Sequence, residues 1–290
     1  MSDLESNTEQ IRRAAEAGDP DAMVELANAY ESGIGCEQDI SVALHWFIRA
    51  ARLRNQHAFD AIGVLRAKGR GVRLNHNSAR KWMQRGAASG NDNSMNGLGY
   101  LDFLQAQAGD TQRYSDARRW FLRSARRGNS EAFRNLGLLY RDGHGVEQST
   151  PRAIKWLKRS VRRNNEKAMR SLAFLYQAHP EFSPDQSTPV DLLLKAHQRG
   201  DSIATIELGI MHFDGDTVEQ DYTAAAQYLT QVDLGRDPEA LYRLGWLQRN
   251  GLGTPRNPEN GMRLIRLAAT LGHIAANRYL SDLEPWQRDG

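Results

Sequence analysis

Eight histidines and one cysteine are the side chains of this sequence best suited to bind a metal ion or to attack a substrate. No two histidines form an HExxH motif, which would place both imidazoles on one helix face around zinc. A single cysteine, Cys36, excludes a disulfide framework and a cysteine-based zinc site, and we expect it to fill a buried apolar position. The histidines are His45, His57, His76, His144, His179, His197, His212 and His273.

Glycine pairs and a carboxylate-rich segment are the remaining candidates for chemistry. A dinucleotide-binding loop needs GxGxxG between a strand and a helix, whereas the GxG pairs here recur between segments with a helical pattern. His144 lies inside one such pair, and we expect it to be exposed. Asp214, Asp216, Glu219 and Asp221 lack the correctly placed glycine and final glutamate of a calcium loop. The sequence therefore predicts no catalytic residues, no metal, no cofactor and no enzymatic activity.

The composition is that of a folded globular chain. Of 290 residues, 40% are hydrophobic and 25% are charged, so the chain has enough apolar surface to form a core and is not disordered. Mean hydropathy is −0.64, and no apolar run approaches the ~20 residues of a membrane span. The first twenty residues lack the apolar segment of a signal peptide. We therefore expect a cytoplasmic protein without a membrane span.

A pattern of residues returns every 36 positions along almost the whole chain. Alanine opens each repeat, except that Ser94 takes this place in the third repeat, which carries two extra residues. The opening alanines are Ala22, Ala58, Ala132, Ala168, Ala204, Ala240 and Ala276. Four residues later come Leu26, Ile62, Leu98, Leu136, Leu172, Leu208 and Leu244. A bulky position further along holds Trp46, Trp82, Trp120, Trp156, Leu192, Tyr228 and Leu264.

Each repeat has the pattern of two helices. Apolar residues recur at i, i+4 and i+8, which predicts helices of about 11–15 residues. Glycine pairs such as Gly33 and Gly35 follow the first helix, where a left-handed residue ends a helix without steric cost. Side chains that cap helices precede the second: Asp39, Asn75, Ser149, Asp221 and Asn257. We therefore predict an all-α fold, a right-handed α-α superhelical solenoid of helix pairs.

The repeat boundaries divide the chain into three parts. We predict an N-terminal capping helix (1–21), seven repeats (22–275) and a C-terminal capping half-repeat (276–290). The repeats are 22–57, 58–93, 94–131, 132–167, 168–203, 204–239 and 240–275. Both capping segments are polar, which favours a monomer over end-to-end stacking.

Two connections depart from the pattern. The third repeat replaces the glycine pair with a longer loop, 105–115, and the fifth has a proline-rich loop, 177–189. In the fifth repeat we predict Thr188 as the N-cap and Pro189 as the first residue of the second helix. Such loops are either functional insertions or drifted connections.

These repeats resemble the Sel1-like repeat, a relative of the tetratricopeptide repeat, whose pattern reads A-x3-L-G-x2-Y-x2-G-x-G-V-x2-D-x3-A-x2-W-x3-A-A-x2-G. The fourth repeat matches it with Ala132, Leu136, Gly137, Tyr140, Gly143, Gly145, Val146, Ala153 and Trp156. The first matches with Ala22, Leu26, Tyr30, Gly33, Gly35, Asp39, Ala43, Trp46, Ala50 and Ala51. The resemblance implies a bacterial protein-interaction scaffold. Secreted members often carry a cysteine pair in each repeat, so a chain without these pairs implies a reducing compartment.

By analogy with tetratricopeptide packing, the first helices line a concave groove. Positions two before, two after and five after the Leu26 column are expected to face it, and one such column includes Asp60 and Asn96. Arginine beside aromatic and aliphatic groups is typical of protein interfaces, although some of these positions could instead pack between repeats. The predicted groove residues are Tyr100, Phe103, Arg134, Leu138, Arg141, Arg170, Phe174, Ile206, Ile210, Phe213, Tyr242 and Trp246.

Positive charge is concentrated in the middle of the chain. Residues 118–170 contain fifteen Lys or Arg and four Asp or Glu, a net +11, which leaves −8 for the rest of a chain of net +3. This region is either a solvated convex surface or a binding surface for an acidic protein. No stacking aromatic residues are interleaved with it, so nucleic acid or an anionic membrane is less favoured. This basic face comprises Arg118, Arg119, Arg123, Arg126, Arg127, Lys155, Lys158, Arg159, Arg162 and Arg163.

Taken together, the sequence predicts a non-enzymatic scaffold or adaptor that holds a partner protein, such as a signalling or envelope component, in its groove. An alternative is an immunity or inhibitor protein that neutralises a bacterial secreted toxic effector through a tight one-to-one complex. A second alternative is a binder of nucleic acid or an anionic surface through the basic face, which would bind with a steep salt dependence.

Overall fold

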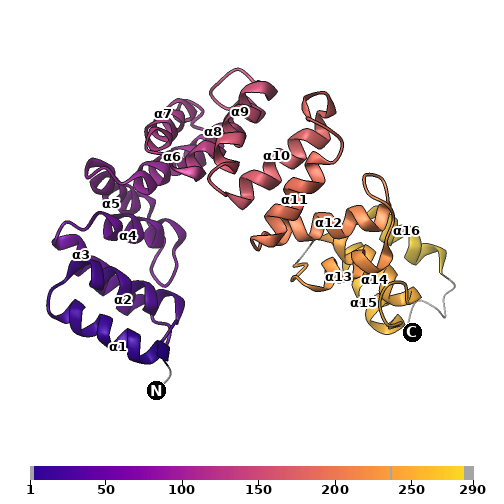
Figure 1. Ribbon diagram of the computed structural model, residues 1–290, viewed down its shortest axis with the longest axis horizontal. Helices are drawn as coiled ribbons and strands as arrows, with labels where there is room; N and C mark the ends of the chain where they lie inside the picture. Colours follow the sequence, from indigo (N-terminus) through magenta and orange to yellow (C-terminus); the bar gives the residue numbers. More distant parts are fainter. Residues whose placement is uncertain (1–2, 236, 284–290) are drawn as a thin grey trace. The chain divides into compact units, whose positions relative to one another are not determined.

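Sixteen α-helices and one short 3-10 helix make up the part of the chain that this computed structural model describes, residues 3–235 and 237–283, and no strand occurs there (Figure 1). The helices form two compact units, unit 1 (Met1–Ser160) and unit 2 (Val161–Gly290). The predicted all-α solenoid of helix pairs is confirmed. None of the described helices has the length and apolar character needed to cross a membrane.

Unit 1 begins with a single helix and continues with helix pairs. Its helices are α1 (Asp3–Glu16), α2 (Pro20–Ser32), α3 (Ile40–Arg52), α4 (Gln56–Lys68), α5 (His76–Ala88), α6 (Asp92–Gln107), α7 (Arg113–Arg126), α8 (Ser130–Asp142) and α9 (Thr150–Val161). Each even-numbered helix from α2 onward is the first helix of a repeat. Helices α2, α4 and α6 each pack against the second helix that follows in the chain, and α8 contacts α9 where the ring of Phe133 stacks on Trp156.

Unit 2 continues the same alternation. Its helices are α10 (Glu166–Ala178), the 3-10 helix η1 (Pro180–Phe182), α11 (Thr188–Gln198), α12 (Ser202–Asp214), α13 (Tyr222–Thr230), α14 (Pro238–Asn250), α15 (Pro258–Thr270) and α16 (Ile274–Asp282). The repeat at 168–203 therefore keeps its helix pair despite its irregular loop. Residues 284–290, the end of the predicted C-terminal half-repeat, lie outside the described residues.

The predicted helix ends are where the capping residues place them. Five first helices end at a glycine in the left-handed region, with φ between 64° and 75°: Gly33, Gly69, Gly143, Gly215 and Gly251. At the start of second helices, Asp39, Asn75, Asp221 and Asn257 accept hydrogen bonds from backbone N–H groups of the first turn. These caps satisfy donors that a helix terminus leaves unpaired.

The core lies between the two helices of each repeat and between neighbouring repeats. The leucine column is buried throughout, as Leu26, Ile62, Leu98 and Leu136 show with no exposed surface. The residue after each member of the leucine column is small, because the two helices of a repeat approach closely at this position. At Gly137, for example, a Cβ would lie 2.8 Å from Cγ of Leu157. The small column therefore sets the distance between the first and second helix.

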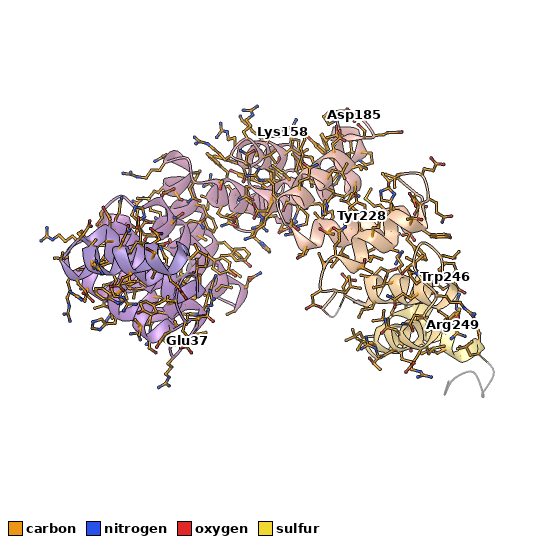
Figure 2. All side chains as sticks on the ribbon, turned by 60° about the horizontal axis from the view of Figure 1, so that its bottom comes forward. Glu37, Lys158, Asp185, Tyr228, Trp246 and Arg249 are labelled. Atoms are coloured by element: carbon orange, nitrogen blue, oxygen red, sulfur yellow. The ribbon has the colours of Figure 1, made fainter. Side chains whose placement is uncertain are left out.

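The two irregular connections differ in part from the expected loops. Helix α6 extends to Gln107 and α7 begins at Arg113, so both ends of the predicted loop 105–115 are helical. In the other loop, the prediction that Thr188 caps α11 was wrong, because Thr188 is the first residue of that helix. Ser187 occupies the N-cap position, but its side chain makes no capping hydrogen bond. The carboxylate of Asp185 takes that role by accepting from the N–H and hydroxyl groups of Ser187 and Thr188 (Figure 2).

Candidate functional site

In unit 1 the structure places Tyr100 beside a cavity of about 280 Å³ on the first helices α4 and α6. The phenol ring is 50% exposed, the largest exposed fraction of any predicted groove residue. The cavity is lined by residues of these helices and by Met83 of α5, among them Asp60, Val64, Asn96, Tyr100 and Leu104. An exposed aromatic side chain next to a hollow is a common anchor point of protein interfaces.

Asp60 is the acidic residue among those that line this cavity, and Lys68 is the basic one. Burial raises the pKa of its carboxyl to about 6, and the nearby carboxylate of Asp92 also raises it. Two groups lower this pKa: the hydroxyl of Ser94, which donates a hydrogen bond to the carboxylate over 3.4 Å, and His57. Their effect is smaller than that of burial, so the pKa of Asp60 stays raised. The cavity therefore contains a carboxylate that costs free energy to ionise.

Phe103, the next predicted groove residue, is half-buried in an aromatic cluster of unit 1. Its ring packs edge-on against Tyr114 at 5.7 Å and against His144 at 5.8 Å. His144 in turn stacks on Tyr114 with ring centroids 4.7 Å apart. The expectation that His144 is simply exposed was wrong, because its position in the glycine turn places the imidazole against the start of α7.

The remaining groove residues of unit 1 lie on α8. Arg134 is half-buried and lies 3.8 Å from a carboxylate oxygen of Glu131, one turn earlier. Arg141 is bonded in a bidentate manner to Asp142, at 2.6 and 2.8 Å. Leu138 between them is half-buried. Both arginines therefore already have acidic neighbours within the chain.

In unit 2, two predicted groove residues are engaged in the packing of the repeats. Ile206 is only 8% exposed and belongs to the core of this unit, so it is not available to a partner. The guanidinium of Arg170 lies 3.2 Å from the carboxylate of Asp201, and the Asp201 side chain is only 5% exposed. Phe174, on the same helix as Arg170, is half-buried.

Phe213 and Trp246 meet in a second aromatic cluster, with Tyr222 as its third member. The three ring-to-ring distances are 5.5 to 5.7 Å, and Ile210 packs against the same core. Figure 2 shows Trp246 on α14. Because it joins rings from three helices, Trp246 stabilises the fold as well as contributing to the surface.

Unit 2 has a cavity of about 780 Å³, which is larger than the cavity of about 280 Å³ in unit 1. It lies at the first helices α12, α14 and α16, and Tyr242 is among its lining residues. The Tyr242 ring stacks on His273 at 4.6 Å. Nearby Arg243 pairs with Asp214 at 2.7 Å and with Glu239. The Glu239 carboxylate also accepts from Nε2 of His273 at 3.0 Å, because Nδ1 of that ring accepts the backbone N–H of Ala276. Arg243, Asp214, Glu239 and His273 thus form one network of ion pairs and hydrogen bonds at this cavity.

The pKa directions in this network follow from these contacts. Burial alone would raise the pKa of Glu239, but bonds to Arg243 and His273 outweigh it and lower the value. Burial would likewise lower the pKa of Arg243, and its bonds to Asp214 and Glu239 raise it instead. Of these residues only Tyr242 is in the predicted groove columns, because the contacts of the others are made with neighbouring repeats.

The residues of the basic face lie on the second helices α7 and α9 or directly after them. Of its ten residues only Arg118 is half-buried, and the others are open to solvent. We expected no aromatic rings among these basic residues, and this expectation was wrong. The guanidinium group of Arg123 lies 4.9 Å from the ring centroid of Trp120, and that of Arg159 lies 4.7 Å from the ring centroid of Trp156. Arg162 and Arg163 follow α9 and belong to unit 2.

The same tryptophan–arginine stack occurs four times in unit 1. Arg49 lies over Trp46 and Arg85 over Trp82 at 4.4 and 4.9 Å, on the second helices of the preceding repeats. In each case the arginine is three residues after the tryptophan, so both side chains share one helix face. The guanidinium groups cover the indole faces, which leaves the rings poorly placed to stack on bases.

Groups suited to catalysis do not gather among the described residues. No cluster of three or more His, Cys, Asp or Glu able to hold a metal ion is found there. Cys36 is half-buried, and burial raises the pKa of its thiol although Arg12 partly opposes the shift. A thiol with a raised pKa is a poor nucleophile.

Helix pairs in register with close-packed small residues and glycine-ended first helices define a helical repeat protein of the solenoid class. The Sel1 repeat family model matches residues 20–55, 61–91, 93–129, 130–165, 202–231 and 238–273, which is well over half of the chain. The chain belongs to the Sel1 repeat family. Proteins of this family are typically non-catalytic scaffolds for protein–protein interaction. The six matched repeats leave out the one with the proline-rich loop.

Solved structures show the same fold. A Sel1 repeat protein from Oxalobacter formigenes is 24% identical over 96% of this chain and 81% of that chain, with a TM-score of 0.66. A protective antigen of uropathogenic Escherichia coli with an SLR fold is 22% identical over 99% and 70% of the two chains, with a TM-score of 0.53. No curated protein sequence matches the chain significantly.

Proposed function

We propose that this protein is a non-enzymatic interaction scaffold that binds a partner protein through the exposed faces of its first helices. The observation that carries this proposal is that both units have a cavity on first helices, at positions that the groove columns include. Tyr100 borders one cavity and Tyr242 lines the other. Rigid helix pairs present such side chains without the ordering cost that a flexible segment incurs on binding.

The anchors differ in how freely they can contact a partner. Tyr100 is the most exposed of the predicted groove residues, whereas Phe103, Phe213 and Trp246 also hold their own units together. Arg134, Arg141 and Arg170 have acidic neighbours and would have to exchange them to bind a partner's acidic groups. We therefore assign the main contact in unit 1 to Tyr100.

A cytoplasmic, monomeric protein fits this role. The one cysteine has no disulfide partner, and a reducing compartment requires none. An inhibitor of a toxic effector is the alternative form of the same activity. It differs in requiring a single partner, one-to-one stoichiometry and loss of that partner's activity on binding.

Affinity capture with matched variants tests the proposal. The bait is the full chain, compared with Tyr100→Ala and with Leu53→Ala, which removes another exposed apolar side chain from the end of a second helix and is 53% exposed. We expect a protein retained by the wild type and by Leu53→Ala but lost with Tyr100→Ala. Equal recovery with all three baits would contradict binding through the first helices.

The basic face gives the other alternative and a different result. Replacing Arg123 and Arg159 by glutamine removes charge that is exposed on second helices. If recovery of nucleic acid or an acidic protein depends on these two residues and falls steeply with salt, the partner binds the basic face instead. The first-helix proposal expects recovery to be unchanged by this variant.

A further inference from the structure

The cavity on α4 and α6 in unit 1 is lined by the carboxylate of Asp60, by Lys68 and by apolar residues that include Val64 and Leu104. The two helices occupy the same place in successive repeats, so Asp60 of α4 and Asn96 of α6 lie at corresponding positions. From there the lining continues along α4 to Val64 and then to Lys68. Asp60 and Lys68 are eight residues apart, about 12 Å along a helix axis.

Asp60 has no cationic side chain bonded to it among the described residues. Its one hydrogen bond comes from the Ser94 hydroxyl, at 3.4 Å, and the other side chains that affect its pKa are Asp92 and His57. Lys68 is two turns away and makes no described ion pair. Because burial disfavours the ionised carboxyl, a cation brought to this point would relieve an existing electrostatic cost.

The middle of the cavity is suited to an alkyl chain. The Met83 side chain lies over Gly97, where a Cβ would come within 2.7 Å of its Sδ atom and 2.9 Å of its Cε atom. Val64 and Leu104 add apolar surface, and the half-exposed Tyr100 stands beside them. The volume of about 280 Å³ is just below that of pockets for drug-sized ligands, so it suits a single side chain.

We propose that this cavity binds a basic side chain, lysine or arginine, of the partner protein, with the aliphatic stem against Val64 and Met83 and the charged head on Asp60. The inference rests on the proposed function, since it assigns one contact of the same partner. The neutral walls accept the methylene groups while the carboxylate selects for a positive end. The partner is thereby expected to present a protruding basic residue to unit 1.

The test uses n-butylammonium, which has the structure of the lysine side chain, and 1-butanol as its neutral analogue. Both are titrated at pH 7.5 into the full chain carrying ¹³C-methyl methionine, with the Met83 signal as the reporter. Met169, in unit 2, serves as the internal control. We expect n-butylammonium to shift the Met83 signal of the wild type. We expect 1-butanol to bind the wild type at least about tenfold more weakly, and n-butylammonium to bind Asp60→Asn at least about tenfold more weakly than it binds the wild type.

Each outcome decides the proposal. An unshifted Met83 signal, or equal affinities of the alcohol and the amine, would overturn it. An Asp60→Asn variant that still binds the amine as tightly as wild type would also overturn it. A parallel titration with n-propylguanidinium shows which of the two basic heads the cavity prefers. The titration needs no partner protein, so a titration without binding overturns the cavity proposal alone. Failure to capture a partner protein overturns the proposed function alone.

Discussion

Replacing Asp60 by asparagine is expected to make the protein more stable than wild type at neutral pH, and this advantage is expected to disappear near pH 4. The asparagine side chain has nearly the same shape and can still accept the Ser94 hydrogen bond. Only the charge is lost. In the wild type, the pKa of Asp60 rises from 3.8 to about 6 because burial disfavours its ionised form.

The sign and size follow from proton linkage. A folded-state pKa above the unfolded value means that the folded protein binds more protons between pH 4 and 6, so the free energy of unfolding falls as pH rises through this window. A shift of about two pH units corresponds to about 3 kcal/mol. Burial of the asparagine amide offsets part of this gain, so we expect Asp60→Asn to be about 1–3 kcal/mol more stable than wild type above pH 7.

Urea unfolding followed by tryptophan fluorescence measures this difference from pH 4 to pH 8. Four of the six tryptophans lie in unit 1 with Asp60, so the signal reports mainly this unit. Glu37→Gln, a change at an exposed carboxylate (Figure 2), controls for net charge. The reasoning is refuted if the difference between Asp60→Asn and wild type does not change with pH, or if Glu37→Gln gives the same profile.

Three further substitutions test the packing. Gly137→Ala places a Cβ 2.8 Å from Cγ of Leu157 and should cost about 1–3 kcal/mol in thermal unfolding, whereas an unchanged Tm would mean that the helix pair is loosely packed. Asp39→Ala removes the cap that accepts two backbone bonds at α3 and should cost about 1 kcal/mol, with Asp39→Ser recovering most of it. Trp246→Ala removes ring contacts with Phe213 and should cost about 2–4 kcal/mol in urea unfolding, and a cost near zero would show that the cluster contributes only to the surface.

The helices and their ends could be predicted because their signals are local. The i, i+4, i+8 spacing, the glycine at a left-handed C-terminus and the Asp39-type caps all act within a few residues of where they stand. The length of α6 could not be predicted in this way. No glycine stops it at the usual place, and Gln105, Ala106 and Gln107 have favourable helix propensities, so the helix continues through them.

The candidate site could be predicted only in part, since the exposure of each side chain is set by other repeats. The repeat columns included Asp60 and Tyr100, but not the burial that alters the pKa of Asp60. Arg170 is paired with Asp201, which caps α12, the first helix of the next repeat, and Ile206 packs into the core of unit 2. Such contacts depend on packing between repeats, for which a single sequence carries no direct signal.

Site-specific photo-crosslinking tests most directly whether a partner binds the first helices. The photoreactive amino acid p-benzoylphenylalanine replaces Tyr100 in one bait and Leu53 in another, and each is irradiated in intact cells. If a partner binds the first helices, position 100 gives a covalent adduct with one partner protein and position 53 gives none. Adducts from position 53 alone, or the same adducts from both positions, would contradict binding at the first helices.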